Sequence, residues 1–383
     1  MQARLWLSGQ CFECSVERIA PAADGWVVKT RARRYFRFDA ASIALLRKLM
    51  GINALDRDDP AQASDIGFLQ KRLIPLGIYA LQGAQAAAPK PHASSGAMHW
   101  HRQLLAARHV RPLAAALAPL FSPWLLAPLM ALCLWIHASY VLNTAGQIGY
   151  HDLLTYSPNE LLLLASVAIV RGLLHEFGHA AACWRLTRSV GAIGYGVFIG
   201  TPVLYCDVSD IHLLPRRSKA IVGLAGTAMD IVLLALFVVI GGTDASVVKV
   251  YWLSMAAVLL NLVPFYRNDG YWVMNDLAGT SDLLKESLQA CWSGTARTRD
   301  WLMLGFTALC VIGVLLLAIA FALQFGPEQL AEAAVLLPSF AGVVLALVTT
   351  LQYAALGFGA FAAAKTVSSG VQTRLNASRS VSV

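Results

Sequence analysis

Two histidines and a glutamate, spaced as on a metal-binding helix, stand inside an apolar stretch at residues 169–184. His175 and His179 are four residues apart, so on a helix of about 3.6 residues per turn both imidazoles project from the same face. Two neutral ring nitrogens placed in this way can bind one Zn²⁺, and Glu176, about 100° round the helix, can act on a water molecule as general base without being a ligand. The alternative is a pair of histidines hydrogen-bonded to neighbouring helices. The apolar surroundings favour a metal site, because ionisable groups at membrane depth are costly and usually mark function.

The composition places these residues in a membrane protein. Of the 383 residues, 57% are hydrophobic and only 14% are charged, and the mean hydropathy is +0.58. These values indicate an α-helical polytopic membrane protein embedded in a lipid bilayer. The net charge of +8 comes from Lys and Arg that gather in particular loops, which reports orientation and predicts no nucleic-acid partner. The seven cysteines are scattered, so no disulfide framework is indicated, and the lone C-x-x-C at Cys11 and Cys14 is weak evidence for a metal site.

Six apolar stretches are each long enough, at about 20 residues, to cross a bilayer. We expect these spans near 120–142, 160–183, 218–241, 247–266, 301–325 and 334–362. The loop after the first span contains no Lys or Arg, whereas basic residues follow the second and fourth spans and recur in the tail. The positive-inside rule then predicts that both termini are cytoplasmic and that the two histidines lie near the cytoplasmic end of the second span.

The first 82 residues are expected to form a small soluble α+β domain of winged-helix-like order. The patterns predict two strands, two helices and a return strand, in that order, at 26–28, 35–38, 40–50, 64–76 and 78–81. Asp39 is the expected N-cap of the first helix. The segment WVVKTRARRYFRFDAASIALLRKL, residues 26–49, resembles the PqqD-like peptide-recognition domains of ribosomal peptide maturation systems. This resemblance implies that a leader peptide binds as a strand added to an exposed sheet edge; a small cap domain without a ligand is the alternative.

Two histidines leave a catalytic zinc one protein ligand short of the usual three. The acidic and histidine side chains available downstream are Asp207, Asp210, His212, Asp230 and Asp269. We favour Asp269, because it follows the cytoplasmic end of the fourth span and therefore lies on the same side as the histidines. Pro264 breaks that helix and Gly270 lets the chain turn sharply. Asn261 can bond the carbonyls that the proline frees, or a substrate strand.

The sequence HEFGH, followed by N-x-x-P from Asn261 and by D-G at Asp269, resembles the site-2-protease family of intramembrane zinc metalloproteases. The bacterial "peptide zinc metalloprotease" branch is more similar, since D-G-Y-W at 269–272 and C-D-V-S-D at 206–210 resemble segments that recur there. The resemblance covers roughly residues 160–290. It implies one zinc ion per chain and the following roles: His175, His179 and Asp269 as ligands, Glu176 as general base and Asn261 as a substrate-positioning residue.

The sequence departs from the family pattern in two places. Asn268 stands before D-G where a leucine is usual, and Thr227 follows Ala225-Gly226 where the family usually has proline. Neither change removes a ligand, but both bear on the shape of the substrate channel. The predicted division is a PqqD-like domain, a linker with a basic interfacial segment, a six-span metallopeptidase domain and a cytoplasmic tail, at 1–82, 83–112, 113–365 and 366–383.

Two further charged residues lie at membrane depth. Arg171 stands one turn before His175, and Asp230 lies in the third span; we expect them to pair, because an isolated charge there is costly. A role in admitting water to the zinc is the functional alternative. His137 in the first span is interpreted as a polar packing group. Residues 191–208 predict a β-hairpin at the membrane surface, which could pair with an extended substrate or serve packing alone.

These observations favour a membrane-embedded zinc metalloendopeptidase of a bacterial cytoplasmic membrane. Its expected partner is a peptide precursor or a small membrane-bound protein, cleaved near the cytoplasmic leaflet, in association with an export or peptide-modification system. A non-proteolytic membrane receptor or export partner for a modified peptide is the alternative. A di-iron oxidase would need several histidine boxes, which nine histidines, many of them in the linker and loops, do not supply.

Overall fold

The structure, a computed structural model, describes most of the chain up to residue 313. The described residues are 4–22, 25–56, 59–83, 98–147, 156–198, 201–264, 268–280, 282–309 and 312–313. The chain divides into two compact units. Unit 1 comprises Met1–Gly96 together with Ser209–Lys219, and unit 2 comprises Ala97–Val208 and Ala220–Val383.

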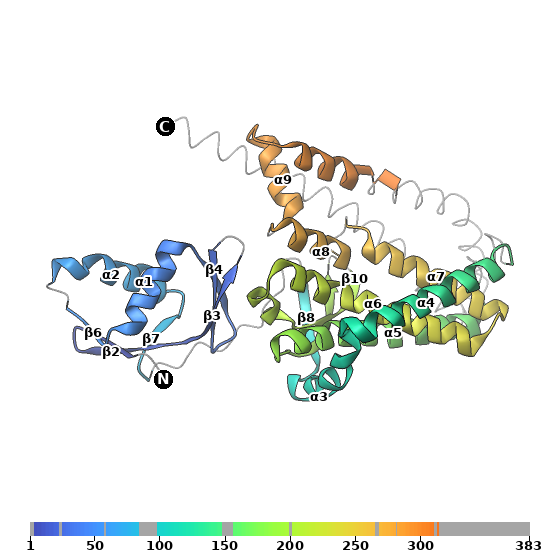
Figure 1. Cartoon of the computed structure of the whole chain (residues 1–383), viewed down its shortest axis with the longest axis horizontal. Coiled ribbons are helices and arrows are strands. Elements are labelled where there is room, and N and C mark those ends of the chain that lie inside the picture. The colour runs from blue at the N-terminus through green and yellow to red at the C-terminus, as the bar shows by residue number, and fades with distance from the viewer. Residues whose placement is uncertain are drawn as a thin grey trace, which may run out of the picture. The chain divides into compact units, whose positions relative to one another are not determined.

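Unit 1 contains two small sheets and two helical segments (Figure 1). The strands of the first sheet, in the order β6-β1-β2-β7, are Ala54–Leu55, Arg4–Leu7, Gln10–Cys14 and Tyr79–Leu81. The second sheet is antiparallel, in the order β3-β4-β5, and its strands are Val16–Ala22, Gly25–Thr30 and Tyr35–Phe38. The strands predicted at 26–28, 35–38 and 78–81 are therefore confirmed, whereas β1, β2 and β3 were not predicted.

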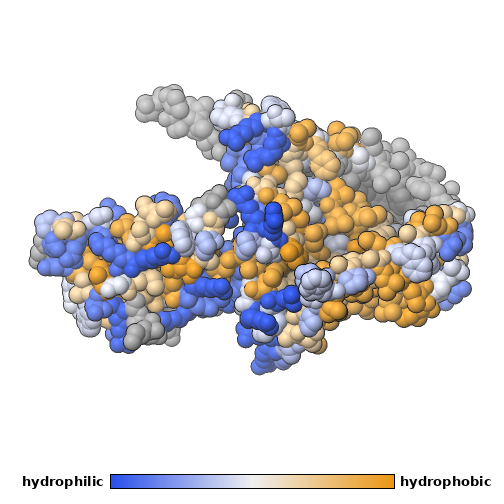
Figure 2. Space-filling model, viewed as in Figure 1, coloured by the Kyte–Doolittle hydropathy of each residue, from blue (hydrophilic) through white to orange (hydrophobic). Residues whose placement is uncertain are grey.

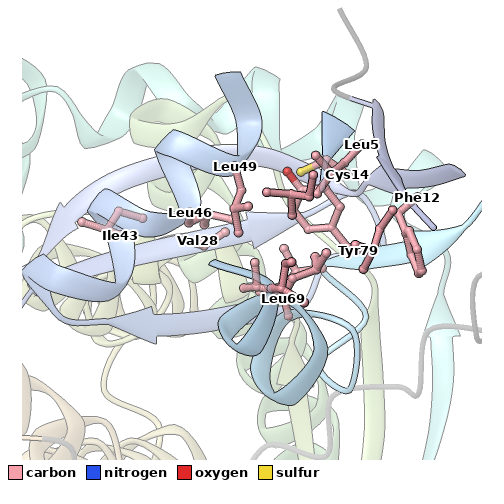
Figure 3. Packing of buried hydrophobic residues seen from close by; sticks show 14 of the residues in the cluster. Leu5, Phe12, Cys14, Val28, Ile43, Leu46, Leu49, Leu69 and Tyr79 are labelled. Carbon is pink, nitrogen blue, oxygen red and sulfur yellow. The ribbon is translucent and has the colours of Figure 1, made fainter. Parts of the chain in front are cut away.

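The helix α1, Ala40–Gly51, forms for the reasons read from its sequence. The Asp39 side chain accepts a hydrogen bond of 2.7 Å from the backbone N–H of Ser42, which satisfies a donor that the first turn leaves free. Ile43, Leu46 and Leu49 recur at helical spacing and are almost fully buried. Figure 3 shows these side chains meeting residues of both sheets and of the second helical segment in one hydrophobic core.

The second predicted helix of unit 1 is shorter and less regular than its periodicity suggested. The helix α2 covers Ala63–Phe68, and the chain continues through a π-helical turn, η2, at Leu69–Leu73. Leu69 and Leu73, four residues apart within the predicted helix at 64–76, are fully buried. A π turn shifts the helical phase by one residue, so hydrophobic spacing predicted the face correctly but not the backbone.

A segment distant in sequence completes unit 1. The short helix η4, Ser209–Leu213, places Asp210 where its carboxylate lies 2.8 Å from Lys29 Nζ and accepts a 2.8 Å hydrogen bond from the Tyr35 hydroxyl. Leu213 packs against Ala20 and Val27 of the second sheet. Residues 209–219 therefore belong structurally to the N-terminal sheet, although they lead directly into the helix α6.

Unit 2 is mostly helical. Four of its helices are long and apolar enough to cross a membrane: α4, α5, α6 and α7, at Pro123–Thr144, Pro158–Thr187, Arg216–Gly241 and Ala245–Leu262. They confirm the first four predicted spans and indicate a multi-pass membrane protein. Figure 2 shows hydrophobic residues gathered over the surface of these helices. Residues 298–309 and 312–313 are helical, but the rest of the predicted spans at 301–325 and 334–362 and the tail at 366–383 lie outside the described residues.

The longest helix, α5, has well-defined ends. A capping box begins it: the Ser157 backbone N–H donates to Glu160 Oε2 at 2.7 Å, and the Glu160 N–H donates to Ser157 Oγ at 3.3 Å. Arg188 ends it in the left-handed conformation, with φ of 58°. The first half exposes side chains such as Leu162 and Ile169, whereas every residue from Glu176 to Cys183 is buried. The helix α3, Ala107–Leu117, packs against this buried half.

A three-stranded antiparallel sheet lies beside α5, in the order β10-β9-β8. The hairpin predicted within 191–208 is confirmed as β9, Ile193–Phe198, and β10, Thr201–Cys206. The third strand, β8, covers Met98–Leu105 and pairs with β9. This region was predicted to be a basic interfacial segment, and no strand was predicted there.

After α7 the chain enters two short helices, α8 at Asp269–Ala278 and α9 at Leu283–Trp292. Asn268 is the N-cap of α8, since its side-chain oxygen accepts from the Tyr271 backbone N–H at 3.0 Å. Its side-chain amide donates to the carbonyls of Leu260 and Val263, both at 2.8 Å. Asn268 thus ties the end of α7 to the start of α8, which gives a structural reason for the departure from leucine.

Candidate metal centre

Three side chains from two elements converge at the buried half of α5. His175 Nε2 lies 2.9 Å and His179 Nε2 lies 3.4 Å from Asp269 Oδ2, and the two Nε2 atoms are 3.1 Å apart. Among the described residues this is the group of His, Cys, Asp and Glu side chains that could hold a metal ion. Of the five residues considered as a third ligand, the structure brings Asp269 to the histidine pair.

The spacing of the three atoms fits a tetrahedral zinc site. Zinc–nitrogen and zinc–oxygen bonds of about 2.0–2.1 Å in a tetrahedron separate neighbouring ligand atoms by about 3.3 Å. The separations of 2.9, 3.1 and 3.4 Å lie close to that value. Two imidazole nitrogens and one carboxylate oxygen are also a donor set that zinc accepts, with a fourth position left for water or substrate.

The helix α6 holds the opposite nitrogen of each histidine. His179 Nδ1 lies 2.7 Å from the Val222 carbonyl oxygen, and His175 Nδ1 lies 2.9 Å from Asp230 Oδ2. A carbonyl oxygen can only accept a hydrogen bond, so Nδ1 of His179 carries the proton. An ionised carboxylate imposes the same tautomer on His175. Both Nε2 lone pairs are then directed toward Asp269, as metal binding requires.

Glycine at two positions allows α5 and α6 to approach this closely. A Cβ atom on Gly226 would lie 2.5 Å from Nε2 of both His175 and His179. A Cβ atom on Gly178 of α5 would lie 2.5 Å from the Ala225 carbonyl oxygen. Gly226 therefore leaves open the space in which the two ligand atoms meet, and Gly178 permits the backbone contact that brings α6 there.

Glu176 lies on the side of the centre nearest β10. Its side chain is buried, interacts electrostatically with both histidines and Asp269, and is hydrogen-bonded to the backbone of Cys206, the last residue of β10. The Cys206 N–H therefore orients a carboxylate that stands beside the three converging atoms.

Asn261, predicted to position substrate, contacts a member of the centre. Its side-chain amide donates to Asp269 Oδ2 at 2.9 Å. This hydrogen bond orients the carboxylate oxygen that faces both histidines. The predicted contact of Asn261 with substrate stays a prediction.

The pair predicted at membrane depth is present. Arg171 Nη1 lies 3.1 Å from Asp230 Oδ2. The contact of the same oxygen with His175 was not predicted; the signal was the four-residue spacing of Val222, Gly226 and Asp230, which places all three on one face of α6. His137 is a packing group as expected, since its ring nitrogens contact the Tyr251 hydroxyl at 3.2 Å and the Ile231 carbonyl at 3.0 Å.

Among the described residues, four helices long and apolar enough to cross a membrane indicate a multi-pass membrane protein, and the His–His–Asp group is a possible metal site. A curated protein of Mycolicibacterium smegmatis, named "Putative zinc metalloprotease Rip2", is 33% identical over 132 residues, which cover 26% of this chain and 50% of that protein. The chain thus spans half the length of the curated relative it matches. No family model and no solved structure matches the chain. The distant similarity suggests peptidase activity.

Proposed function

We propose that the chain is a membrane-embedded zinc metalloendopeptidase. It hydrolyses a peptide bond of a peptide precursor or membrane-bound protein near the cytoplasmic leaflet of a bacterial membrane. The observation that carries this proposal is the convergence of His175, His179 and Asp269 within 3.4 Å of one another, next to the buried carboxylate of Glu176. The similarity to a protein named as a zinc metalloprotease supports the same activity.

The three converging residues would hold zinc, with Asn261 fixing the orientation of the Asp269 carboxylate. When bound, zinc would lower the pKa of a water molecule and polarise the carbonyl of the scissile bond. Glu176 takes a proton from the attacking water while the water oxygen bonds to the carbonyl carbon. Glu176 then gives that proton to the amine nitrogen as the carbon–nitrogen bond breaks. The products are a new carboxyl terminus and a new amino terminus.

The sheet beside α5 offers a way to hold an extended substrate. In the described residues β10 is an edge strand of the order β10-β9-β8, and its last residue, Cys206, is hydrogen-bonded to Glu176. A substrate segment added along β10 would pass its backbone close to the general base. Asn261, at the end of α7, would then contact the substrate from the opposite helix.

The N-terminal unit is proposed to recruit the peptide. Its strands and helices support the winged-helix-like, PqqD-like interpretation, in which a leader peptide adds to a sheet edge. Both termini would be cytoplasmic, so that recruitment and cleavage occur on the same side of the membrane. An export or peptide-modification system would supply the substrate.

The test compares purified wild type with Glu176→Gln and with the control Glu13→Gln, which removes a partly exposed carboxylate of unit 1 that pairs with Arg4. Bound zinc is quantified in all three proteins, and cleavage of precursor peptides is followed by mass spectrometry. The proposal predicts about one zinc per chain in each protein and cleavage by wild type and the control only. Wild type that binds zinc but cleaves no peptide would support the receptor or export-partner alternative. Cleavage that survives in Glu176→Gln would overturn the proposed mechanism.

A further inference from the structure

The two ligand histidines are oriented by different kinds of acceptor. The acceptor for His179 is a backbone carbonyl, that of Val222, which the fold of α6 supplies whatever the side chain. The acceptor for His175 is the side chain of Asp230. His175 is therefore the ligand whose orientation depends on a single residue of this sequence.

The Asp230 side chain is buried and makes this contact together with a second one. It is 1% exposed, and its Oδ2 atom receives both the His175 Nδ1–H at 2.9 Å and Arg171 Nη1 at 3.1 Å. Arg171 stands one helical turn before His175 on α5, so the two groups reach the same oxygen from the same face. The arginine offsets part of the cost of burying a carboxylate at membrane depth.

A purely structural ion pair does not account for the geometry of Asp230. Its second oxygen, Oδ1, is buried and makes no hydrogen bond within the part of the chain that the structure describes, which leaves the desolvation of that oxygen uncompensated. A pair selected for stability alone would be expected to satisfy both oxygens. The carboxylate is instead turned so that one oxygen serves the arginine and the histidine together.

We propose that Asp230 is a positioning residue for the metal centre: it orients the His175 ring and holds the proton on Nδ1, so that Nε2 binds zinc. The inference rests on the proposed zinc site and names a residue, outside the ligand set, that governs its affinity. A carboxylate behind a ligating histidine fixes the ring and raises its basicity, and its loss typically weakens metal binding by about 10–100-fold. Arg171 acts one step further away, by holding Asp230.

The test must separate orientation from the loss of a buried charge. Removing Asp230 alone would leave Arg171 without a partner and could prevent folding. The double variant Arg171→Met/Asp230→Leu replaces both charges by apolar side chains of similar size, a change that is often neutral for stability. The variant Arg171→Met/Asp230→Asn is equally uncharged but keeps a side-chain oxygen that can accept from His175 Nδ1.

A second carboxylate–cation pair supplies the matched control. Glu160 Oε1 lies 2.9 Å from Lys249 Nζ, between α5 and α7, and Glu160 stands about 22 Å before His175 along α5. In Glu160→Gln/Lys249→Met the capping box at the start of α5 is kept, because glutamine also fits it. This variant loses an interhelical ion pair of the same type without touching His175.

The measurements use the full chain in detergent: zinc affinity by competition with a chelator, the absorption spectrum with Co²⁺, and kcat and KM at saturating zinc. We expect the leucine variant to bind zinc about 10–100-fold more weakly, with a changed Co²⁺ spectrum and a lower kcat at similar KM. The asparagine variant should recover most of that affinity, and the control should bind zinc as wild type does.

Two results would overturn the inference: zinc affinity and Co²⁺ spectrum of the leucine variant equal to those of wild type, or a control that weakens binding as much. Either result would leave the proposed peptidase intact. If wild type itself binds no zinc, the proposed function fails, and the inference with it. The two failures are therefore distinguishable in one set of proteins.

Discussion

Two buried carboxylates, one in each unit of the chain, have nearly the same immediate surroundings. Asp210 and Asp230 are each 1% exposed. Asp210 lies 2.8 Å from the Lys29 ammonium and 2.8 Å from the Tyr35 hydroxyl. Asp230 lies 3.1 Å from the Arg171 guanidinium and 2.9 Å from His175 Nδ1. Each therefore combines a cation with a hydrogen-bonding ring.

What differs is the far side of the ring. The Tyr35 phenol has a single polar atom, the hydroxyl oxygen, which donates to Asp210 and also interacts with Arg33, so this cluster stabilises unit 1. The imidazole of His175 offers two nitrogens, and the second lies 2.9 Å from Asp269 and 3.1 Å from His179 Nε2. A buried ion pair is thus no sign of chemistry by itself. What indicates chemistry is a ring whose second polar atom, once oriented by the carboxylate, faces another functional group.

The largest effect is expected at the candidate metal centre in unit 2. In Gly226→Ala the new Cβ would fall 2.5 Å from both Nε2 atoms, so the two nitrogens cannot keep their positions. We expect zinc affinity to fall by more than the roughly 10–100-fold typical of residues that only orient a ligand. The control is Gly305→Ala in the helical residues 298–309, where a new Cβ would have no neighbour within 4 Å among the described residues. Metal content of the two purified variants decides the prediction, and equal zinc in both would contradict it.

A smaller effect is expected from Asp210→Ala, which changes the buried carboxylate of unit 1. Without Asp210, the Lys29 side chain, which is 8% exposed, still pairs with the exposed Glu17 carboxylate at 3.1 Å, so local stability should fall by less than the roughly 3–5 kcal/mol expected for an unpaired buried charge. Hydrogen exchange followed by mass spectrometry should show faster opening of β4 and β5. The zinc content should remain that of wild type. Loss of zinc in this variant would show that the two carboxylates are not separate in function.

The smallest effect is expected from Tyr35→Phe, which removes the hydroxyl that donates to Asp210. A hydrogen bond to a charged group contributes about 1.5–3 kcal/mol, so opening of β5 should accelerate less than in Asp210→Ala. Burial and the Asp210 carboxylate raise the pKa of Tyr35 above its ordinary value. Because the folded protein holds the phenol protonated, this stabilisation is complete below the unfolded pKa of about 10 and declines as the pH rises above it. The ratio of the protection factors of the β5 amides in wild type and in the variant should therefore be constant from pH 6 to about pH 9. A ratio that falls within that range would contradict the prediction.

Much of this molecule could be predicted from local patterns. The helix α1 follows from the Asp39 cap and the spacing of its leucines, and the four spans follow from apolar length. The pairing of Arg171 with Asp230 follows from the cost of an isolated charge at membrane depth. Each of these predictions depends only on residues close in sequence or on the apolar character of the lipid bilayer.

Some of the features that were missed depend on partners distant in sequence. The strand β8 forms because it pairs with β9, and the helices α3, α4 and α5 lie between these two strands in the sequence. The contact of Asp230 with His175 could not be chosen over its contact with Arg171, since one carboxylate oxygen serves both. Asn268 looked like a departure from a family pattern, and its role became clear only from its bonds to Leu260, Val263 and Tyr271.

The segment at residues 209–219 has a practical consequence for dividing the chain. It completes the sheet of unit 1 through Asp210 and Leu213, yet it is continuous with the hairpin β9-β10 before it and the helix α6 after it. A polypeptide ending at residue 96 would expose the sheet face that Leu213 covers, and one beginning at residue 97 would carry Asp210 without Lys29. Expressed together as two polypeptides, the halves should reassociate through this segment, so that complementation in trans would succeed where either fragment alone aggregates.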